Sequence, residues 1–179
     1  MVVGAAKELP AVLKALREKK CLAPNDEIGL FGFSAGGAAV LIALTEPDVH
    51  VRAAVTVNAP TGLSAAIDAM ERATKRQYVW TAPARQLAER TDSIRRAAAI
   101  GSGNSPPALL LFHGADDTIV MPNGAVSLRE ALQPYYQRSG NDQRLKLVIA
   151  PGVSHNWTEP RPLEQLRASV ADWFNRYLL

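Results

Sequence analysis

Four short apolar runs are spaced along the chain, and each is continuous rather than alternating with polar residues. They lie at Glu27–Phe33, Arg52–Asn58, Ala108–Phe112 and Leu145–Ala150. Continuous runs of this length are typical of strands that are covered on both faces, as in a parallel sheet. The pattern therefore predicts four buried strands.

Helical patterns lie between and around these runs. Leucine and valine recur at helical spacing over residues 9–16, which predicts an amphipathic helix that ends near Cys21–Pro24. Residues 35–44 are almost wholly apolar, so that helix should be buried, and residues 163–179 carry their apolar side chains on one face. The alternation of helix and strand predicts an α/β fold with a mostly parallel sheet and right-handed crossovers.

One long connection interrupts the alternation. Pro60–Pro107 contains no strand pattern, but it has helical patterns at Leu63–Lys75 and Ala82–Ile100. A connection of this length inside a compact domain usually forms a lid or a binding surface. We therefore expect one domain over residues 1–179, with a helical lid insertion at residues 60–107.

Length and composition agree with one globular domain. The chain has 179 residues, of which 47% are hydrophobic and 21% charged, which excludes disordered, collagen-like and coiled-coil classes. The surplus of 3 positive charges is scattered rather than gathered on one stripe, so nucleic-acid binding is not expected.

The same sequence argues against secretion and membrane insertion. A single cysteine, Cys21, cannot form an internal disulfide, which favours a reducing compartment. No apolar stretch reaches the length of a membrane span, and the first residues lack the pattern of a signal peptide. We therefore expect a cytoplasmic protein with no membrane partner.

A G-x-S-x-G sequence, Gly32 to Gly36, directly follows the first predicted strand and precedes the buried helix. A serine hydroxyl reaches substrate best from a sharp, strained turn, where small neighbours allow close backbone packing. Gly32 and Gly36 are expected to supply that room, and the Ala35 backbone N–H is expected to stabilise an oxyanion. The alternative is that Ser34 merely occupies a tight structural turn.

A serine nucleophile needs a base and an acid that orients the base, and both follow later strands. Asp117 comes after the third predicted strand and His155 after the fourth. Parallel strands place these positions at one edge of the sheet, so Ser34, Asp117 and His155 could meet. Asp116 is the rival acid, Asp117 could instead cap a turn, and His155 could be a surface loop residue. Structural roles are expected for the other histidines, His50 and His113.

Three segments together resemble the α/β-hydrolase-fold serine esterases: the G-x-S-x-G turn at Gly32–Gly36, called the elbow below, the His-Gly-x-x-Asp segment from His113 to Asp117 and the Gly-x-x-His segment ending at His155. The resemblance covers about Asp26 to the C-terminus. It implies that Asp117 is the acid and His155 the base, with the long connection acting as a cap.

The sequence departs from this family before the nucleophile. Only 33 residues precede Ser34. Before the predicted strand Glu27–Phe33 they hold one helix and no convincing strand beyond the short apolar piece Met1–Val3, so the usual first strands are lacking. The second oxyanion donor normally comes from that region, so we expect a slow enzyme. The strand Glu27–Phe33 would become a sheet edge, which favours a homo-oligomer. A fragment or mis-started reading frame of a longer esterase is the alternative.

These observations predict a serine hydrolase that cleaves small carboxylic esters, with Ser34, Asp117 and His155 catalytic and Ala35 in the oxyanion hole. Three aromatic residues, Tyr78, Trp80 and Trp157, are candidates for substrate binding. No cofactor and no metal are expected, because the chain has no phosphate-binding glycine loop and no ligand cluster. The second hypothesis is a degenerate hydrolase scaffold that acts as a binding or interaction module.

Overall fold

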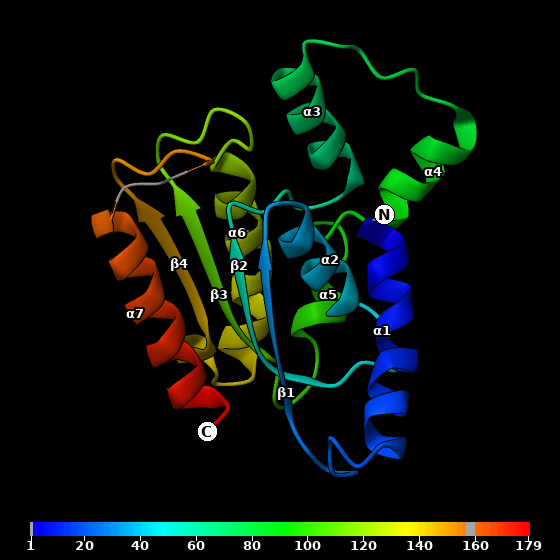
Figure 1. Cartoon of the computed structure of the whole chain (residues 1–179), viewed down its shortest axis with the longest axis vertical. Coiled ribbons are helices and arrows are strands. Elements are labelled where there is room, and N and C mark those ends of the chain that lie inside the picture. The colour runs from blue at the N-terminus through cyan, green and yellow to red at the C-terminus, as the bar shows by residue number, and fades with distance from the viewer. Residues whose placement is uncertain (1, 157–159) are drawn as a thin grey trace.

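The computed structural model describes residues 2–156 and 160–179. Figure 1 shows a parallel sheet between two layers of helices. The elements are α1 (Val2–Glu18), β1 (Ile28–Phe33), α2 (Ala35–Ala43), β2 (Val51–Val57), α3 (Leu63–Thr74), α4 (Ala82–Arg90), α5 (Ala97–Gly101), β3 (Ala108–Gly114), α6 (Asn123–Arg138), the 3-10 turn η1 (Asp142–Arg144), β4 (Leu145–Ala150) and α7 (Pro160–Tyr177). The α/β fold and all four predicted strands are confirmed.

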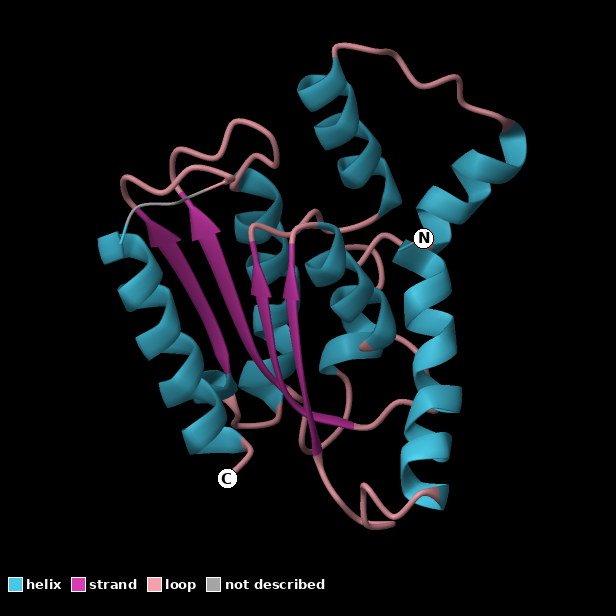
Figure 2. Ribbon diagram, viewed as in Figure 1, coloured by secondary structure: helices cyan, strands magenta, loops and turns pink. Residues whose placement is uncertain are grey.

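The four strands are all parallel and stand in the order β1-β2-β3-β4. Strands that are neighbours in both sequence and space need crossovers of one hand, so α2, α5 and α6 lie on one face. Their side chains form the main core with residues such as Leu109 and Leu111 of β3. Helix α7 covers the other face, where Trp173 and Leu166 pack with Val55 and Phe112. Figure 2 shows the strands in magenta between these helices.

Helix α1 lies outside this frame, against α2. Ala6 of α1 packs with Ile42 and Ala43, and Val2 and Val3 complete the contact. The helix therefore begins earlier than the leucine spacing predicts, and it contains Pro10. The N-terminal residues that offered no convincing strand are helical.

Helix α6 is the element that the sequence patterns above did not assign. Its buried side chains are Ala125, Leu128, Leu132 and Tyr136, at spacings of three and four residues. Pro134 interrupts the helical pattern near the end, although the spacing of the buried residues is a helical signal that the sequence carries.

The long connection differs from a uniform helical lid. Its predicted second helix, Ala82–Ile100, is two helices, α4 and α5, separated by a turn. Ala97 and Ile100 of α5 belong to the main core. In Figure 1, α3 and α4 stand away from the sheet, joined by an extended segment. Only the first part of the connection therefore projects from the body.

Candidate active site

Ser34 occupies the sharp turn between β1 and α2, at the carboxyl edge of the sheet. Its φ is 50° and its ψ is −120°, a conformation that is strained for a residue with a side chain. A Cβ at Gly32 would lie 2.4 Å from the Gly36 carbonyl oxygen, and one at Gly37 would lie 2.5 Å from the Ala59 Cβ. A Cβ at Gly36 would meet nothing within 4 Å. Gly32 and Gly37 therefore supply the room, and the expectation for Gly36 is wrong.

The structure brings Ser34, His155 and Asp117 together in one chain of contacts. The Ser34 Oγ lies 3.0 Å from His155 Nε2, and His155 Nδ1 lies 2.8 Å from Asp117 Oδ2. A carboxylate oxygen only accepts, so Nδ1 donates its proton to Asp117. In the neutral ring Nε2 is then the acceptor, and the Ser34 hydroxyl donates to it.

The acid in contact with His155 is Asp117, and its side chain is fully buried. The other oxygen, Oδ1, accepts from the backbone N–H groups of Ile119 at 2.9 Å and Val120 at 2.8 Å. Asp117 therefore caps the turn and contacts His155 at the same time, because Oδ1 accepts from the backbone and Oδ2 accepts from the imidazole. The rival acid, Asp116, is exposed, and its backbone N–H donates to the Val153 carbonyl.

Beneath this acid lies His113, which is buried. Its Nε2 lies 2.8 Å from the Val120 carbonyl, and since a carbonyl only accepts, Nε2 carries a proton. Burial lowers the pKa of His113 from 6.5, so the ring is neutral near physiological pH. Its Nε2 is also 3.5 Å from Asp117 Oδ2. His50 is exposed at the other end of the sheet, and neither ring contacts Ser34.

Asn58, directly after β2, is a site residue that the sequence reasoning missed. Its side chain is fully buried, and its Nδ2 donates to the carbonyls of Ser154 at 3.1 Å and His155 at 3.3 Å. Its Oδ1 accepts from the Gly114 N–H at 2.8 Å. One amide therefore joins the ends of β2 and β3 to the loop that carries His155. A lone asparagine at the end of an apolar strand was the available signal.

The loops that carry Asp117 and His155 are also joined through their backbones. The Ala115 N–H donates to the Ala150 carbonyl at 2.9 Å, and the Asp116 N–H donates to Val153 at 3.1 Å. A Cβ at Gly114 would lie 2.2 Å from the Val153 carbonyl oxygen, so only glycine allows this approach. The separation of His155 and Asp117 is thus fixed by main chain as well as by side chains.

The other residues predicted for the site lie on α2 and on the connection between α3 and α4. Ala35 is the first residue of α2, so its N–H has no acceptor within the helix and faces the edge where Ser34 lies. Tyr78 and Trp80 contact each other edge to face, with ring centroids 5.1 Å apart, on the segment between α3 and α4. Trp157 lies outside the described residues. Phe33 packs on the His155 ring, with centroids 5.4 Å apart.

Over residues 2–156 and 160–179, no group of three or more histidine, cysteine or acidic side chains could hold a metal. Among the same residues, no helix is both long enough and apolar enough to cross a membrane.

Comparison with known proteins places the chain in a family. The model of the prolyl oligopeptidase family matches residues 4–179. The chain belongs to the prolyl oligopeptidase family. This membership agrees with the fold, because solved α/β-hydrolase structures superpose on most of the chain. A puromycin-hydrolysing peptidase of Mycobacterium tuberculosis covers 97% of this chain with a TM-score of 0.72 and 21% identity, and the match spans 25% of that protein.

The chain is also similar to a solved esterase domain and to a curated mycobacterial protein. The esterase domain of a Rhodothermus marinus protein covers 94% of this chain with a TM-score of 0.61 and 19% identity, and the match spans 68% of that domain. A Mycobacterium tuberculosis protein described as a phosphoribosyl transferase is 26% identical over 151 residues, which are 84% of this chain and 24% of the relative. The chain spans about a quarter of the length of the curated relatives that it matches.

Proposed function

We propose that this chain carries the acyl-transfer site of a serine hydrolase that cleaves small carboxylic esters. The single observation that supports this most strongly is the hydrogen-bond chain from the Ser34 hydroxyl through His155 to the buried Asp117 carboxylate. Family membership supports the same chemistry. The strained turn at Ser34 is also typical of a nucleophile that must stand clear of its neighbours.

The proposed reaction has two steps. His155 Nε2 takes the Ser34 proton while Oγ forms a bond to the ester carbonyl carbon, and the oxyanion lies at the Ala35 N–H. His155 then gives that proton to the leaving alcohol as the C–O bond breaks. In the second step His155 takes a proton from water, which attacks the acyl-enzyme carbonyl. His155 returns the proton to the Ser34 Oγ as the carboxylic acid product leaves. Asp117 holds Nδ1 protonated and stabilises the imidazolium throughout.

The size of a cavity beside the loop that follows Asp117 favours a small substrate. A cavity of about 330 Å³ is lined by Ala59 and Thr61 after β2 and by Val120 and Met121 after the acid turn. That volume lies at the low end for ligand pockets. Arg72 of α3 donates to the Ile119 carbonyl at 2.8 Å, which ties the projecting helix to the acid loop. Substrate binding by Tyr78 and Trp80 stays a prediction.

Hydrolysis of peptide or aminoacyl amide bonds is the second candidate, favoured by the family match. Ester and amide cleavage share the same acyl-enzyme, and they differ in the leaving group that His155 must protonate. A fold shared with esterases and peptidases does not choose between them. The choice therefore rests on rates measured with matched aryl esters and aminoacyl arylamides.

The test compares the wild-type chain with Ser34→Ala and with a control, Ser169→Ala on α7. We expect short-chain aryl esters to be cleaved faster than long-chain esters, and a fluorophosphonate to label Ser34. Both signals should vanish in Ser34→Ala and persist in Ser169→Ala. Undiminished turnover in Ser34→Ala would refute the proposal. A well-folded wild-type chain that neither turns over nor labels would favour the binding-module hypothesis instead.

A further inference from the structure

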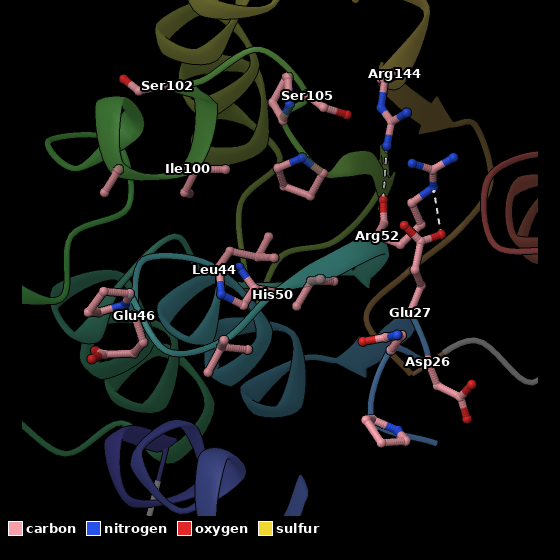
Figure 3. A pocket seen from close by; sticks show the side chains of 18 of the residues that line it. Asp26, Glu27, Leu44, Glu46, His50, Arg52, Ile100, Ser102, Ser105 and Arg144 are labelled. Carbon is pink, nitrogen blue, oxygen red and sulfur yellow. Dashed lines mark hydrogen bonds and ion pairs between the residues drawn. The ribbon is translucent and has the colours of Figure 1, made fainter. Parts of the chain in front are cut away.

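A second cavity lies at the opposite end of the sheet from Ser34, where the parallel strands begin. It has a volume of about 690 Å³ and is lined by residues that precede β1, β2, β3 and β4 (Figure 3). The Ser34, Asp117 and His155 side chains follow the other ends of these strands. The cavity is therefore separate from the proposed acyl-transfer site.

Arg144, the last residue of η1, brings a buried charge to this cavity. It is 8% exposed, and one terminal nitrogen, Nη2, donates to the Arg52 carbonyl at 3.2 Å. Its Nε is buried and has no hydrogen-bond partner. In the part of the chain that the structure describes, no carboxylate lies within ion-pair distance of Arg144. Buried charges are ordinarily paired, so this one calls for a partner.

Arg52 places a second guanidinium beside the first, as Figure 3 shows. Its Nε donates to the Tyr177 carbonyl at 3.0 Å and lies 3.2 Å from the Glu27 carboxylate. Burial, and then the charge of Arg52, lower the pKa of Arg144. Two positive groups thus face one carboxylate at this end of the cavity.

The other charged residues of the cavity do not neutralise this pair. Figure 3 places Glu46 at the far side from Arg144, and it shows the Asp26 carboxylate turned away. The Asp26 carboxylate accepts from the Ala23 N–H at 2.7 Å. Arg17 of α1 also lines the cavity, and its Nε is likewise buried without a partner. The arginine end of the cavity therefore keeps an excess of positive charge.

We propose that this cavity binds a small organic anion, whose phosphate or carboxylate group lies between the guanidinium groups of Arg144 and Arg52. Guanidinium groups suit such oxyanions because they offer several N–H donors in one plane. The apolar body of the ligand would lie along Leu44, Val49 and Ile100, which line the same cavity. The volume is within the range of small-molecule sites.

The experiment measures binding by calorimetry in a chloride buffer at fixed ionic strength, with phenyl phosphate, phenylacetate and inorganic phosphate as probes. We expect one saturable site, at least tenfold tighter for a phenyl-bearing probe than for inorganic phosphate. The comparison of phenyl phosphate with phenylacetate identifies the acidic group. Ser34→Ala should bind as the wild type does, because the cavity lies at the other end of the sheet.

Arg144→Gln should weaken binding at least tenfold, because it removes the buried charge. The Arg144 guanidinium lies over the Tyr177 ring, 5.5 Å from its centroid. The matched control is therefore Arg138→Gln, because the Arg138 guanidinium lies over the Tyr135 ring, 4.7 Å from its centroid, but lines a different surface. Equal binding by Arg144→Gln and Arg138→Gln would overturn the proposal, and so would the absence of saturable binding to the wild type.

A second variant keeps the test decisive if Arg144→Gln does not fold. Ser105 is exposed and lines the cavity on the Arg144 side in Figure 3, so Ser105→Glu brings a carboxylate to the arginines from within the chain. We expect this variant to have a higher Tm than the wild type and to lose anion binding. An unchanged Tm together with unchanged binding would contradict the proposal.

Discussion

The Asn58 side-chain amide donates to the backbone carbonyl of His155, 3.3 Å away, and so holds the His155 loop against the end of β2. The same side chain accepts from the Gly114 N–H, in the strand end that leads to Asp117. Asn58 itself has a φ of 47°, a conformation that asparagine tolerates better than most residues. It acts on the site through its neighbours, without touching the Ser34 hydroxyl.

Asn58→Ala should therefore lower kcat by about 10²-fold, because misplacement of a base by about 1 Å has an effect of that size. Unfolding free energy should also fall, by about 1–3 kcal/mol for each buried group left unpaired. The control is Asn141→Ala, since Asn141 also donates from its amide to backbone carbonyls, Asn104 and Ser139, far from the site. Equal kcat values for the two variants would show that Asn58 only stabilises the fold.

Replacing Asp117 by asparagine tests which carboxylate orients the base. The new amide would place an N–H where Oδ2 now accepts, and His155 would present the wrong tautomer to Ser34. The same change lowers kcat by about 10⁴-fold in a well-studied protease, and we expect a similar loss here. Asp116→Asn is the control, because the Asp116 side chain is exposed. A larger loss in Asp116→Asn would reassign the acid.

The glycines of the elbow should differ sharply in their tolerance of alanine. Gly32→Ala pushes a Cβ to 2.4 Å from the Gly36 carbonyl oxygen, so unfolding free energy should fall by at least about 1–3 kcal/mol. Gly36→Ala meets no atom within 4 Å, and alanine in a helix is favoured over glycine by about 1 kcal/mol. Urea unfolding measures both changes. A destabilised Gly36→Ala would contradict this interpretation.

The sequence predicted the sheet well because continuous apolar runs and the elbow are local signals. Strand Leu145–Ala150 has the predicted bounds. Strand β1 begins one residue later than predicted, and β2 is displaced by one residue at both ends. Ser34, Asp117 and His155 each follow the carboxyl end of a predicted strand, and parallel strands bring these ends to one edge of the sheet. The meeting of the three residues could therefore be predicted from the sequence.

Contacts between distant loops could not be predicted in the same way. Asn58 reaches Ser154, 96 positions away, and spacing carries no information about such a pair. The role of Gly37 depends on Ala59, a residue of another strand end, so the local pattern pointed to Gly36 instead. Between α4 and α5 the Asp92 carboxylate accepts from the N–H groups of Ile94 and Arg95, and Ala97 then packs in the core, where the pattern predicted one continuous helix.

Stability should fall in mild acid because of His113. Its pKa is lowered by burial, so the unfolded chain takes up the proton first as the pH falls below 6.5. Stability from this group is therefore fully present above that pH and is lost below it, down to the lowered pKa of the folded state. Urea midpoints at pH 8 and pH 5.5 measure the change. His113→Gln, which keeps a donor for Val120, should show a smaller difference between the two; an unchanged difference would assign the acid sensitivity elsewhere.

Strand β1 pairs only with β2 among the described residues, so its outer edge and the exposed ring of Phe31 offer a surface for a second copy. An unpaired apolar edge favours strand pairing between chains. We expect light scattering at low micromolar concentration to give a mass above that of one chain, and Phe31→Lys to shift it toward the monomer. Val79→Lys is the control, because Val79 is more exposed, at 83%, but lies between α3 and α4. A monomeric wild type, or equal shifts in both variants, would exclude association through β1.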